Sequence, residues 1–274
     1  MSTISLQQGV MSAAPEAGRL EIGGVQIDCV TEDDVIGHIL GSLAGGRGGW
    51  VVTPNVDVLR QAARDSSIRD LIADADLVIA DGMPVVWISR IKGHPLPGRV
   101  PGSDLIWSLS EAAGQAGASV FLLGGNSGVA EKAAGVLRDA VPGLQVAGHH
   151  CPPMGFESSP PEVEAIFAAL EETKPDIVYC GLGFPKQERL IAQLRHRFPA
   201  TWFLGVGISL SFVCGDMRRA PTWMQERGLE WLHRLSCEPR RLFSRYLVHD
   251  LPFTLYLLMH SAGARGGPLR PETA

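Results

Sequence analysis

The sequence predicts an α/β protein: a Rossmann-like, doubly wound, mostly parallel sheet with a helical appendage at its C-terminal end. Short apolar runs alternate with segments of helical periodicity, which is the order that builds a parallel sheet covered by helices. The alternation stops after Gly207, where a helical, arginine-rich stretch begins. A length of 274 residues suits one large domain with an added segment.

The elements can be assigned in order along the chain. Arg19 to Val30 predicts two short strands around a Gly23-Gly24 turn, and Thr31 suits the N-cap of a helix from Glu32 to Leu43. Apolar runs typical of buried parallel strands follow at Gly49 to Val52, Leu77 to Ala80, Ser119 to Leu123, Ile177 to Cys180 and Thr201 to Val206. Helical segments separate them at Val56 to Asp74, Asp104 to Ala116, Val129 to Ala140, Pro161 to Glu172 and Gln187 to Arg197.

The C-terminal stretch differs from the rest in composition. Trp223 to Leu258 is predicted to be helical. Between Arg218 and Arg245 this part of the acidic chain is rich in arginine, with Arg218, Arg219, Arg227, Arg234, Arg240, Arg241 and Arg245. Its longest apolar run, Leu251 to Met259, is far shorter than the roughly 20 residues that cross a bilayer, so it could lie on a membrane without spanning it. We therefore expect disordered tails at 1–18 and 261–274, an α/β domain at 19–215 and an appendage at 216–260.

Composition excludes some functions. The net charge of −5 gives no general attraction to nucleic acid, and no nucleic-acid partner is expected. The cysteines are odd in number and widely spaced, without a CxxC pair, which is typical of reduced thiols in a cytoplasmic protein. Residues 1–18 do not resemble a secretory signal, because they lack a basic segment followed by a continuous apolar one.

Polar residues follow the first two predicted sheet strands, where ligands of doubly wound sheets bind. Thr53 and Asn55 come after the first strand, and they could be pocket residues or could serve a turn and a helix cap. Asp81 follows the second strand and stands beside Gly82. It could cap the helix after Pro84, or it could act as a general base on an acceptor hydroxyl. We favour the base.

Glycine-rich segments follow two later strands. The first contains Gly124 and Asn126, and the second contains Gly183, Lys186 and Gln187. A glycine turn before a helix offers backbone N–H groups and a positive helix end to a phosphate, so both segments are candidates for substrate binding. Neither completes a dinucleotide or P-loop fingerprint, which disfavours an oxidoreductase. A DxD triplet at Asp74 to Asp76 falls at the opposite end of the sheet, and we expect neither a metal nor a cofactor.

A series of motifs in the last third of the chain is recognisable. Gly205-Val-Gly-Ile-Ser, then Gly215-Asp-Met-Arg-Arg-Ala-Pro-Thr-Trp223, Gly228-Leu-Glu-Trp-Leu-His-Arg-Leu-Ser-Cys-Glu-Pro-Arg-Arg-Leu242 and Arg245-Tyr246 strongly resemble the WecB/TagA/CpsF family of glycosyltransferases (glycosyltransferase family 26). The resemblance also takes in Thr53-Pro-Asn55, Ala80-Asp-Gly82, Arg99 with Gly102 and Asp104, Pro152-Pro-Met-Gly-Phe156 and Gly181-Leu-Gly-Phe-Pro-Lys-Gln-Glu188. The motifs run in family order from about residue 20 to 258.

The resemblance implies an inverting, metal-independent transfer from a UDP-sugar, with UDP-N-acetylmannosamine as the best-known donor. The acceptor would be a polyprenyl-diphosphate-linked sugar at the inner face of the cell membrane, in cell-wall polymer or exopolysaccharide synthesis. It implies that Asp81 is the base, that Thr53 and Asn55 share its pocket, and that Arg99 and Gln187 are further active-site residues. Arginines of the appendage would close over the donor diphosphate, with Arg218, Arg219, Arg234 and Arg241 as candidates, and the appendage would help to recruit the enzyme to the membrane.

Some alternatives stay open. This chain has Leu210-Ser211 where many family members have Phe-Asp, and His150 where they have Tyr, so UDP-glucose or a UDP-uronic acid is an alternative donor. A non-catalytic nucleotide-sugar-binding protein would keep the same fold and pocket. Trp223 and Trp231 could pack the appendage onto the core or meet lipid. The sequence does not distinguish a monomer from a homo-oligomer.

Overall fold

The computed structural model describes residues 18–263, and its centre is a sheet of parallel strands. The 6-stranded sheet has the order β4-β3-β8-β7-β5-β6, and all of its strand pairs are parallel. The strands are β3 (Gly49–Val52), β4 (Leu77–Val78), β5 (Ser119–Gly124), β6 (Gln145–His150), β7 (Ile177–Gly181) and β8 (Trp202–Gly205). The chain leaves β3 toward β4 and later returns to β8 on the other side of β3, so the strand order reverses there. The Rossmann-like fold class is confirmed.

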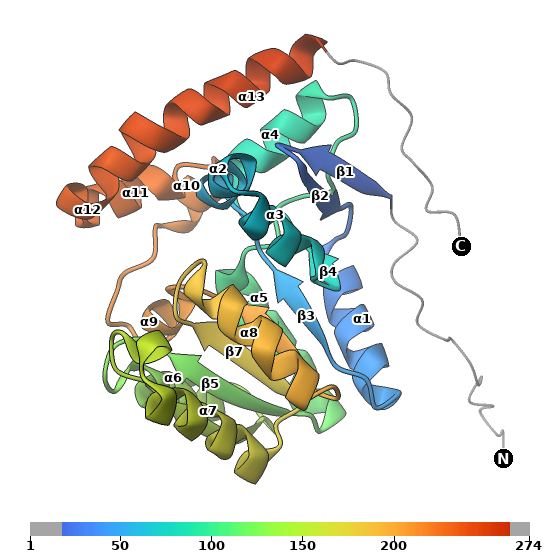
Figure 1. Cartoon of the computed structure of the whole chain (residues 1–274), viewed down its shortest axis with the longest axis vertical. Coiled ribbons are helices and arrows are strands. Elements are labelled where there is room, and N and C mark those ends of the chain that lie inside the picture. Colours follow the sequence, from blue (N-terminus) through green and yellow to red (C-terminus); the bar gives the residue numbers. More distant parts are fainter. Residues whose placement is uncertain (1–17, 264–274) are drawn as a thin grey trace, which may run out of the picture.

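Each face of the sheet carries its own hydrophobic cluster because side chains alternate along a strand. In β3, Trp50 and Val52 belong to one cluster, and Val51 belongs to the other. Helices cover the first face with α2 (Val56–Arg64), α3 (Ser66–Ala73), α7 (Pro160–Thr173) and α8 (Lys186–Arg197). They cover the second face with α1 (Glu32–Ala44), α5 (Gly102–Ala116), α6 (Val129–Ala140) and α9 (Ser209–Val213). Figure 1 shows this layered arrangement.

The N-terminal segment is an antiparallel hairpin beside the main sheet. Strands β1 (Arg19–Ile22) and β2 (Val25–Asp28) pair across the predicted glycine turn. The hairpin is tied to the sheet because Val78 donates its backbone N–H to the Asp28 carboxylate at 2.7 Å. Thr31 caps α1 as predicted: it accepts from the Asp34 N–H, and the Asp34 side chain accepts from the Thr31 N–H.

Some elements differ from the sequence prediction. Strand β6 was not predicted, because its side chains are mostly exposed or half-buried at the sheet edge and form no apolar run. The helix predicted over Val56 to Asp74 is two helices, since Asp65 has extended φ and ψ angles and caps the second through the Ser67 N–H. A helix over Met83–Ile91, α4, follows β4 directly.

The C-terminal appendage consists of helices laid across the carboxyl edge of the sheet. Its elements are α10 (Thr222–Glu226), α11 (Glu230–Cys237), α12 (Pro239–Phe243), a π-helical segment at Ser244–Asp250 and α13 (Leu251–Gly263). Figure 1 shows them, in orange and red, joined to α9 by an extended linker, with α13 running past α2 and α4. Helix α13 continues past residue 260, where the appendage was expected to end. The remaining residues of both predicted tails, 1–17 and 264–274, lie outside the described part of the chain.

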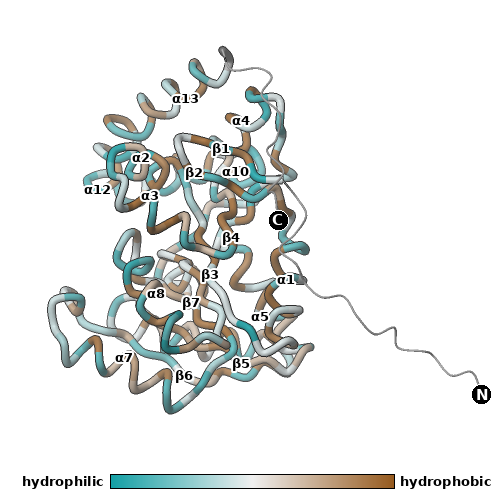
Figure 2. The backbone as a smooth tube through the Cα atoms, turned by 45° about the vertical axis from the view of Figure 1, so that its right-hand side comes forward, coloured by the Kyte–Doolittle hydropathy of each residue, from teal (hydrophilic) through white to brown (hydrophobic). Residues whose placement is uncertain are grey.

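Helix α13 mixes hydrophobic and hydrophilic residues along its length (Figure 2). Leu257 and Phe253 pack toward the hairpin turn at Gly23, whereas Leu251, Leu255 and Met259 are exposed. No helix in residues 18–263 combines the length and apolar character needed to span a membrane.

Candidate active site

A cavity of about 530 Å³ opens at the carboxyl edge of the sheet, between the α/β layers and the appendage. The loops after β3, β4, β7 and β8 form its floor, α4 forms one wall, and α11, the π-helical segment and the start of α13 form the other. This volume is in the usual range for a small-molecule site. The predicted site residues that line it are Thr53, Asn55, Asp81, Arg99, Gly183, Gln187, Arg234 and Arg241.

Asp81 lies in this cavity without a local structural task. The N-cap of α4 is Gly82, which has a φ of 108°, and no side chain caps the helix, so Asp81 is not the cap considered from the sequence. Among the described residues its carboxylate has no hydrogen-bond or ion-pair partner, and it is half-buried. The pKa of Asp81 is raised from 3.8 to about 6, mainly by burial and next by the nearby charge of Glu230. Arg99 and Arg234 lower this pKa, and Asp104 raises it by a smaller amount than Glu230 does. A carboxylate with these properties suits a general base near neutral pH.

Thr53 and Asn55 each combine a structural bond with a place on the cavity wall. The Thr53 hydroxyl donates to the Gly205 carbonyl at 3.2 Å, which joins the ends of β3 and β8. The Asn55 side-chain oxygen caps α2 by accepting from the Val58 N–H at 3.2 Å. Both side chains line the cavity beside Asp81, so the structural and the pocket interpretations hold together.

Gln187 is fixed on the cavity floor by two bonds. Its side-chain oxygen accepts from the Gly183 N–H at 3.1 Å, and its amide donates to Glu188 Oε1 at 2.8 Å. Both side chains are buried, and burial raises the pKa of Glu188 to about 7. Gly205 makes this arrangement possible, because a Cβ there would overlap the Gln187 amide and approach Glu188 Oε1 to 2.8 Å.

Several predicted site residues lie elsewhere. The loop with Gly124 and Asn126 is tied to the Cys151 thiol, which donates to both backbone carbonyls, and it does not line the cavity. Lys186 is exposed and forms an ion pair with Glu157. Arg218 is exposed on the linker, and it too is absent from the cavity wall. The structure therefore brings one of the two glycine-rich segments to the cavity.

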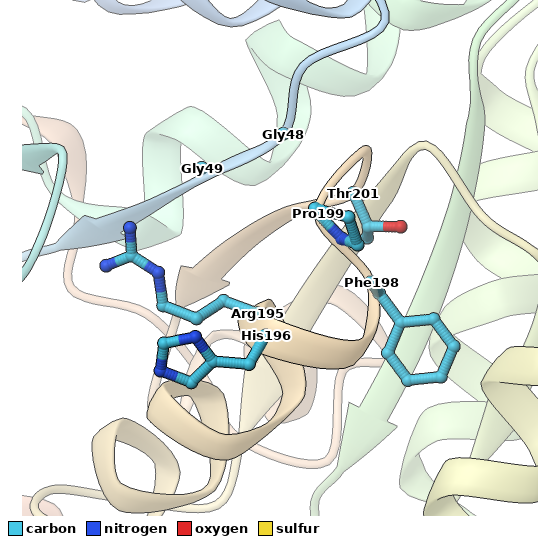
Figure 3. Close-up of a pocket in the computed structure, with 7 residues that line it drawn as sticks. All are labelled: Gly48, Gly49, Arg195, His196, Phe198, Pro199 and Thr201. Carbon is cyan, nitrogen blue, oxygen red and sulfur yellow. The ribbon is translucent and has the colours of Figure 1, made fainter.

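The opposite edge of the sheet carries a smaller hollow of about 240 Å³, shown in Figure 3. It is lined by Gly48, Gly49, Arg195, His196, Phe198, Pro199 and Thr201. Arg195 pairs with Asp76, the last residue of the DxD triplet, at 3.2 Å. The triplet thus stands at the amino end of the sheet, as expected. In the described part of the chain, no group of three or more His, Cys, Asp or Glu side chains is arranged to hold a metal ion.

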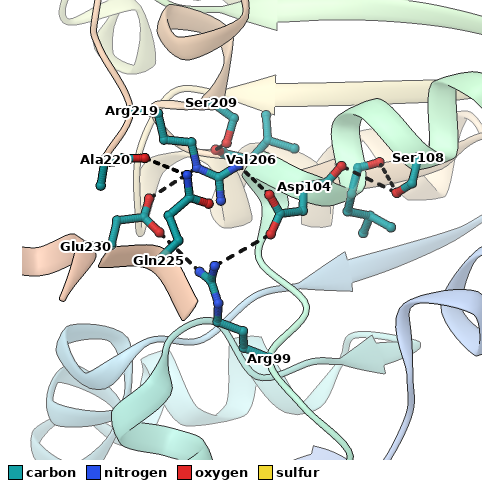
Figure 4. Close-up of polar contacts among 10 residues, drawn as sticks. Arg99, Asp104, Ser108, Val206, Ser209, Arg219, Ala220, Gln225 and Glu230 are labelled. Carbon is teal, nitrogen blue, oxygen red and sulfur yellow. Dashed lines mark hydrogen bonds and ion pairs between the residues drawn. The ribbon is translucent and has the colours of Figure 1, made fainter. Parts of the chain in front are cut away.

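Basic and acidic side chains alternate where the appendage meets the core (Figure 4). Arg99 contacts Glu230 at 3.1 Å and Asp104 at 3.8 Å. Arg219 pairs with Asp104 and lies 3.4 Å from Glu230. Arg219 is therefore engaged in this network and does not line the cavity.

Other arginines of the appendage reach the cavity itself. Arg241 pairs with Glu238 at 2.5 Å, and Arg245 lies 3.2 Å from Asp57. Arg234 lines the cavity with no carboxylate partner among the described residues, and its Nε is buried and unpaired. Arg234 thus adds an uncompensated positive charge to the wall formed by the appendage, and such a charge suits an anionic ligand.

Sequence reasoning missed some cavity residues. Glu188, Trp231, Arg245 and Tyr246 line the cavity but were not among the candidates. The signal was available, because each falls inside a motif that carried the family resemblance. Trp231 is 37% exposed and meets Tyr246 edge-to-face at 6.3 Å, so it belongs to the cavity wall, whereas Trp223 is exposed beside Arg227.

The doubly wound sheet, with a polar cavity at its carboxyl edge and an arginine-rich cover, is that of a glycosyltransferase, as a family match over most of the chain shows. More particularly, the chain belongs to the glycosyl transferase WecG/TagA/CpsF family, whose model matches residues 20–266. It is 35% identical over 196 residues to an N-acetylglucosaminyldiphosphoundecaprenol N-acetyl-beta-D-mannosaminyltransferase of Bacillus spizizenii (strain W23), covering 71% of this chain and 74% of that protein. A protein of the same name from Staphylococcus aureus (strain NCTC 8325) is 30% identical over 226 residues, which cover 82% of this chain and 87% of the relative.

Proposed function

We propose that this glycosyltransferase moves N-acetylmannosamine from its UDP donor to a polyprenyl-diphosphate-linked sugar, in cell-wall polymer or exopolysaccharide synthesis. The observation that carries the proposal is the unpartnered Asp81 carboxylate in a cavity whose opposite wall holds arginines. The names of the relatives support the transferred sugar and the acceptor, since they specify an N-acetylmannosaminyl group and an N-acetylglucosaminyl diphosphoundecaprenol.

The reaction would be a single displacement with inversion. Asp81 takes the proton of the acceptor hydroxyl while that oxygen bonds to the anomeric carbon of the donor sugar. The bond from this carbon to the diphosphate oxygen breaks, and UDP leaves with the electron pair. Arg234, with Arg241 and Arg245, stabilises the negative charge that develops on the departing diphosphate. Thr53, Asn55 and Gln187 offer fixed polar groups to the sugar.

The alternative donors rest on Leu210-Ser211 and His150, the positions that differ from many family members. Leu210 is buried and packs close to Gly181, and His150 lies on the edge strand β6. None of the three lines the cavity, although Ser209 and Phe212, on either side of Leu210-Ser211, do. The names of the relatives specify a mannosaminyl group and so favour that donor over UDP-glucose or a UDP-uronic acid.

The test is UDP release from UDP-N-acetylmannosamine, UDP-N-acetylglucosamine, UDP-glucose and UDP-glucuronic acid, each with a synthetic N-acetylglucosaminyl diphospholipid. We expect release with the mannosaminyl donor, no loss with EDTA, and a β-linked product by NMR. Faster release with another donor would reassign the substrate. Donor binding without turnover across a broad acceptor panel would indicate the non-catalytic alternative.

We also propose that the enzyme is cytoplasmic and attaches peripherally to the inner face of the cell membrane through the appendage. Val248, Leu251, Leu255 and Met259 are exposed and recur at helical spacing, so they form one apolar stripe. Phe253 and Leu258, which belong to the same apolar run, are half-buried against the core. One face of α13 thus packs on the core, and the exposed stripe is the face proposed to contact the membrane.

Vesicle flotation tests the attachment. Leu255→Glu with Met259→Glu should reduce binding to phosphatidylglycerol vesicles by on the order of ten-fold or more, because apolar burial drives interfacial binding. Met154→Glu is the matched control, since Met154 is 97% exposed and lies far from the stripe in the loop after β6. Equal binding by the double variant and the control would refute the attachment through α13.

A further inference from the structure

The ion pairs between core and appendage form a closed ring of alternating charge. Each oxygen of Glu230 faces a different arginine, with Oε2 at 3.1 Å from Arg99 and Oε1 at 3.4 Å from Arg219. The Asp104 oxygens face the same two arginines. Arg99 and Asp104 come from the core, and Arg219 and Glu230 come from the linker and the appendage (Figure 4). The side chains of Arg99 and Glu230 are only 16% and 19% exposed, so solvent screens this pair weakly.

Within this ring the positive charges are already compensated. Two guanidinium groups face two carboxylates, so Arg99 and Arg219 have no unshared charge to offer a ligand. Arg234 differs, because the described residues provide it with no carboxylate partner. The cation best able to hold an anionic ligand is therefore outside the ring.

The position of Glu230 on α11 links the ring to that cation. Glu230 is the first residue of α11, and Arg234 follows one helical turn later on the same face. A second close contact supports the docking, because Gly228 has a φ of 71° and a Cβ there would come within 2.7 Å of Met83 and 3.0 Å of Trp87 on α4. The ring and this contact together fix the N-terminal end of α11 on the core.

We propose that Glu230 is a positioning residue that locks α11 onto Arg99 and so aims Arg234 into the cavity to hold a nucleoside diphosphate. The identity of this ligand rests on the proposed function; the geometry of the lock does not. Glu230 has a second effect, because its charge and that of Asp104 raise the pKa of Asp81, whereas Arg99 and Arg234 lower it. Removing its charge lowers the pKa of Asp81.

The test uses the full-length protein and UDP as the probe. Glu230→Gln should weaken UDP binding by on the order of ten-fold, a typical coupling between packed groups, as measured by calorimetry at pH 8. Glu226→Gln is the matched control, because Glu226 is an exposed glutamate of the same appendage, and it should bind UDP as the wild type does. Unchanged or tighter binding by Glu230→Gln would overturn the proposal, since tighter binding would mean that Glu230 competes with the ligand.

A double-mutant cycle separates positioning from general loss of structure. If Glu230 acts through Arg234, adding Glu230→Gln to Arg234→Gln should weaken UDP binding no further. Additive losses would refute the link to Arg234. The acid limb of the rate profile should also move to lower pH in Glu230→Gln, whereas a purely structural role leaves it in place. If UDP binding follows the cycle but no donor is turned over, the proposed function fails and this inference stands.

Discussion

Strand β4 has an aspartate at each end, and the two differ in what surrounds them. Asp76 precedes the strand and has two partners on one carboxylate oxygen, since Oδ2 accepts from the Trp50 N–H at 2.9 Å and pairs with Arg195 at 3.2 Å. Asp81 follows the strand and has no partner among the described residues, although the burial that raises its pKa to about 6 makes its charge costly. Asp76 forms its contacts at the amino edge of the sheet, whereas the Asp81 carboxylate lines the cavity with acceptor oxygens that no described residue bonds. The carboxylate that the fold does not satisfy is the observation on which the proposed active site rests.

The largest expected difference between variants of Asp81 and Asp76 is in the rate of turnover. Asp81→Asn keeps the shape of the side chain but cannot accept a proton, so UDP release should fall by ~10²–10⁴-fold with donor binding retained. Asp76→Asn should release UDP at close to the wild-type rate per folded molecule. Comparable losses in both variants would mean that Asp81 contributes to the fold rather than to the reaction.

The next effect is on pH dependence. A base must be ionised, so the rate at saturating donor should fall about ten-fold per pH unit below a pH of about 6, the raised pKa of Asp81. Asp76→Asn should leave this limb unchanged, because Asp76 lies at the other edge of the sheet. A limb near pH 4 in the wild type would indicate that Asp81 is not the group that titrates.

A smaller difference is expected in UDP binding between variants of Arg234, in the cavity, and Arg195, at the amino edge of the sheet. Arg234→Gln removes an unpaired cation from the cavity, and UDP binding measured by calorimetry should weaken by on the order of ten-fold. Arg195→Gln removes a cation that already pairs with Asp76 in the other hollow, and UDP binding should not change. Equal losses would place the diphosphate outside the cavity or distribute its contacts over the whole fold.

The smallest expected effect is on the free energy of unfolding, which Asp81→Asn and Asp76→Asn should change in opposite directions. Because the pKa of Asp81 is raised from 3.8 to about 6, the folded state binds more protons than the unfolded state between these values, and stability falls as pH rises through them. Asp81→Asn should therefore be more stable than wild type at pH 8, on the order of 1 kcal/mol after screening in the cavity, and the gain should shrink at pH 4.5.

Asp76→Asn should instead lose up to about 1 kcal/mol, because the partly exposed pair with Arg195 loses its charge while Arg195 keeps its bond to the Asp74 carbonyl. Thermal melts of both variants at the two pH values measure these changes. A loss of stability in Asp81→Asn at pH 8 would show that the carboxylate has a structural partner after all.

The parallel core was predictable because strands buried on both faces leave apolar runs, as in β3 and β5. The edge strand β6 was not, because its half-exposed side chains leave no such run. Asp81 was found from its place at a strand end, but the sequence could not show that Gly82, and not Asp81, begins α4.

Arginine roles were the least predictable from sequence. Composition placed the arginines in the appendage, but only three-dimensional contacts separate Arg219, held in the ring, from the unpaired Arg234. Pairing depends on which carboxylates the fold brings near each guanidinium, and the partners Asp104 and Asp57 lie far away in the chain. The same holds for Lys186, whose partner Glu157 keeps it at the surface.

The most direct test of Asp81 as the base is an NMR titration of its carboxyl carbon in the wild-type protein, assigned by comparison with Asp81→Asn and set beside the acid limb of UDP release. The account predicts that the carboxyl titrates near pH 6 and that the midpoint of the rate limb coincides with it. A carboxyl that titrates near its ordinary value of 3.8, with the rate limb elsewhere, would contradict it.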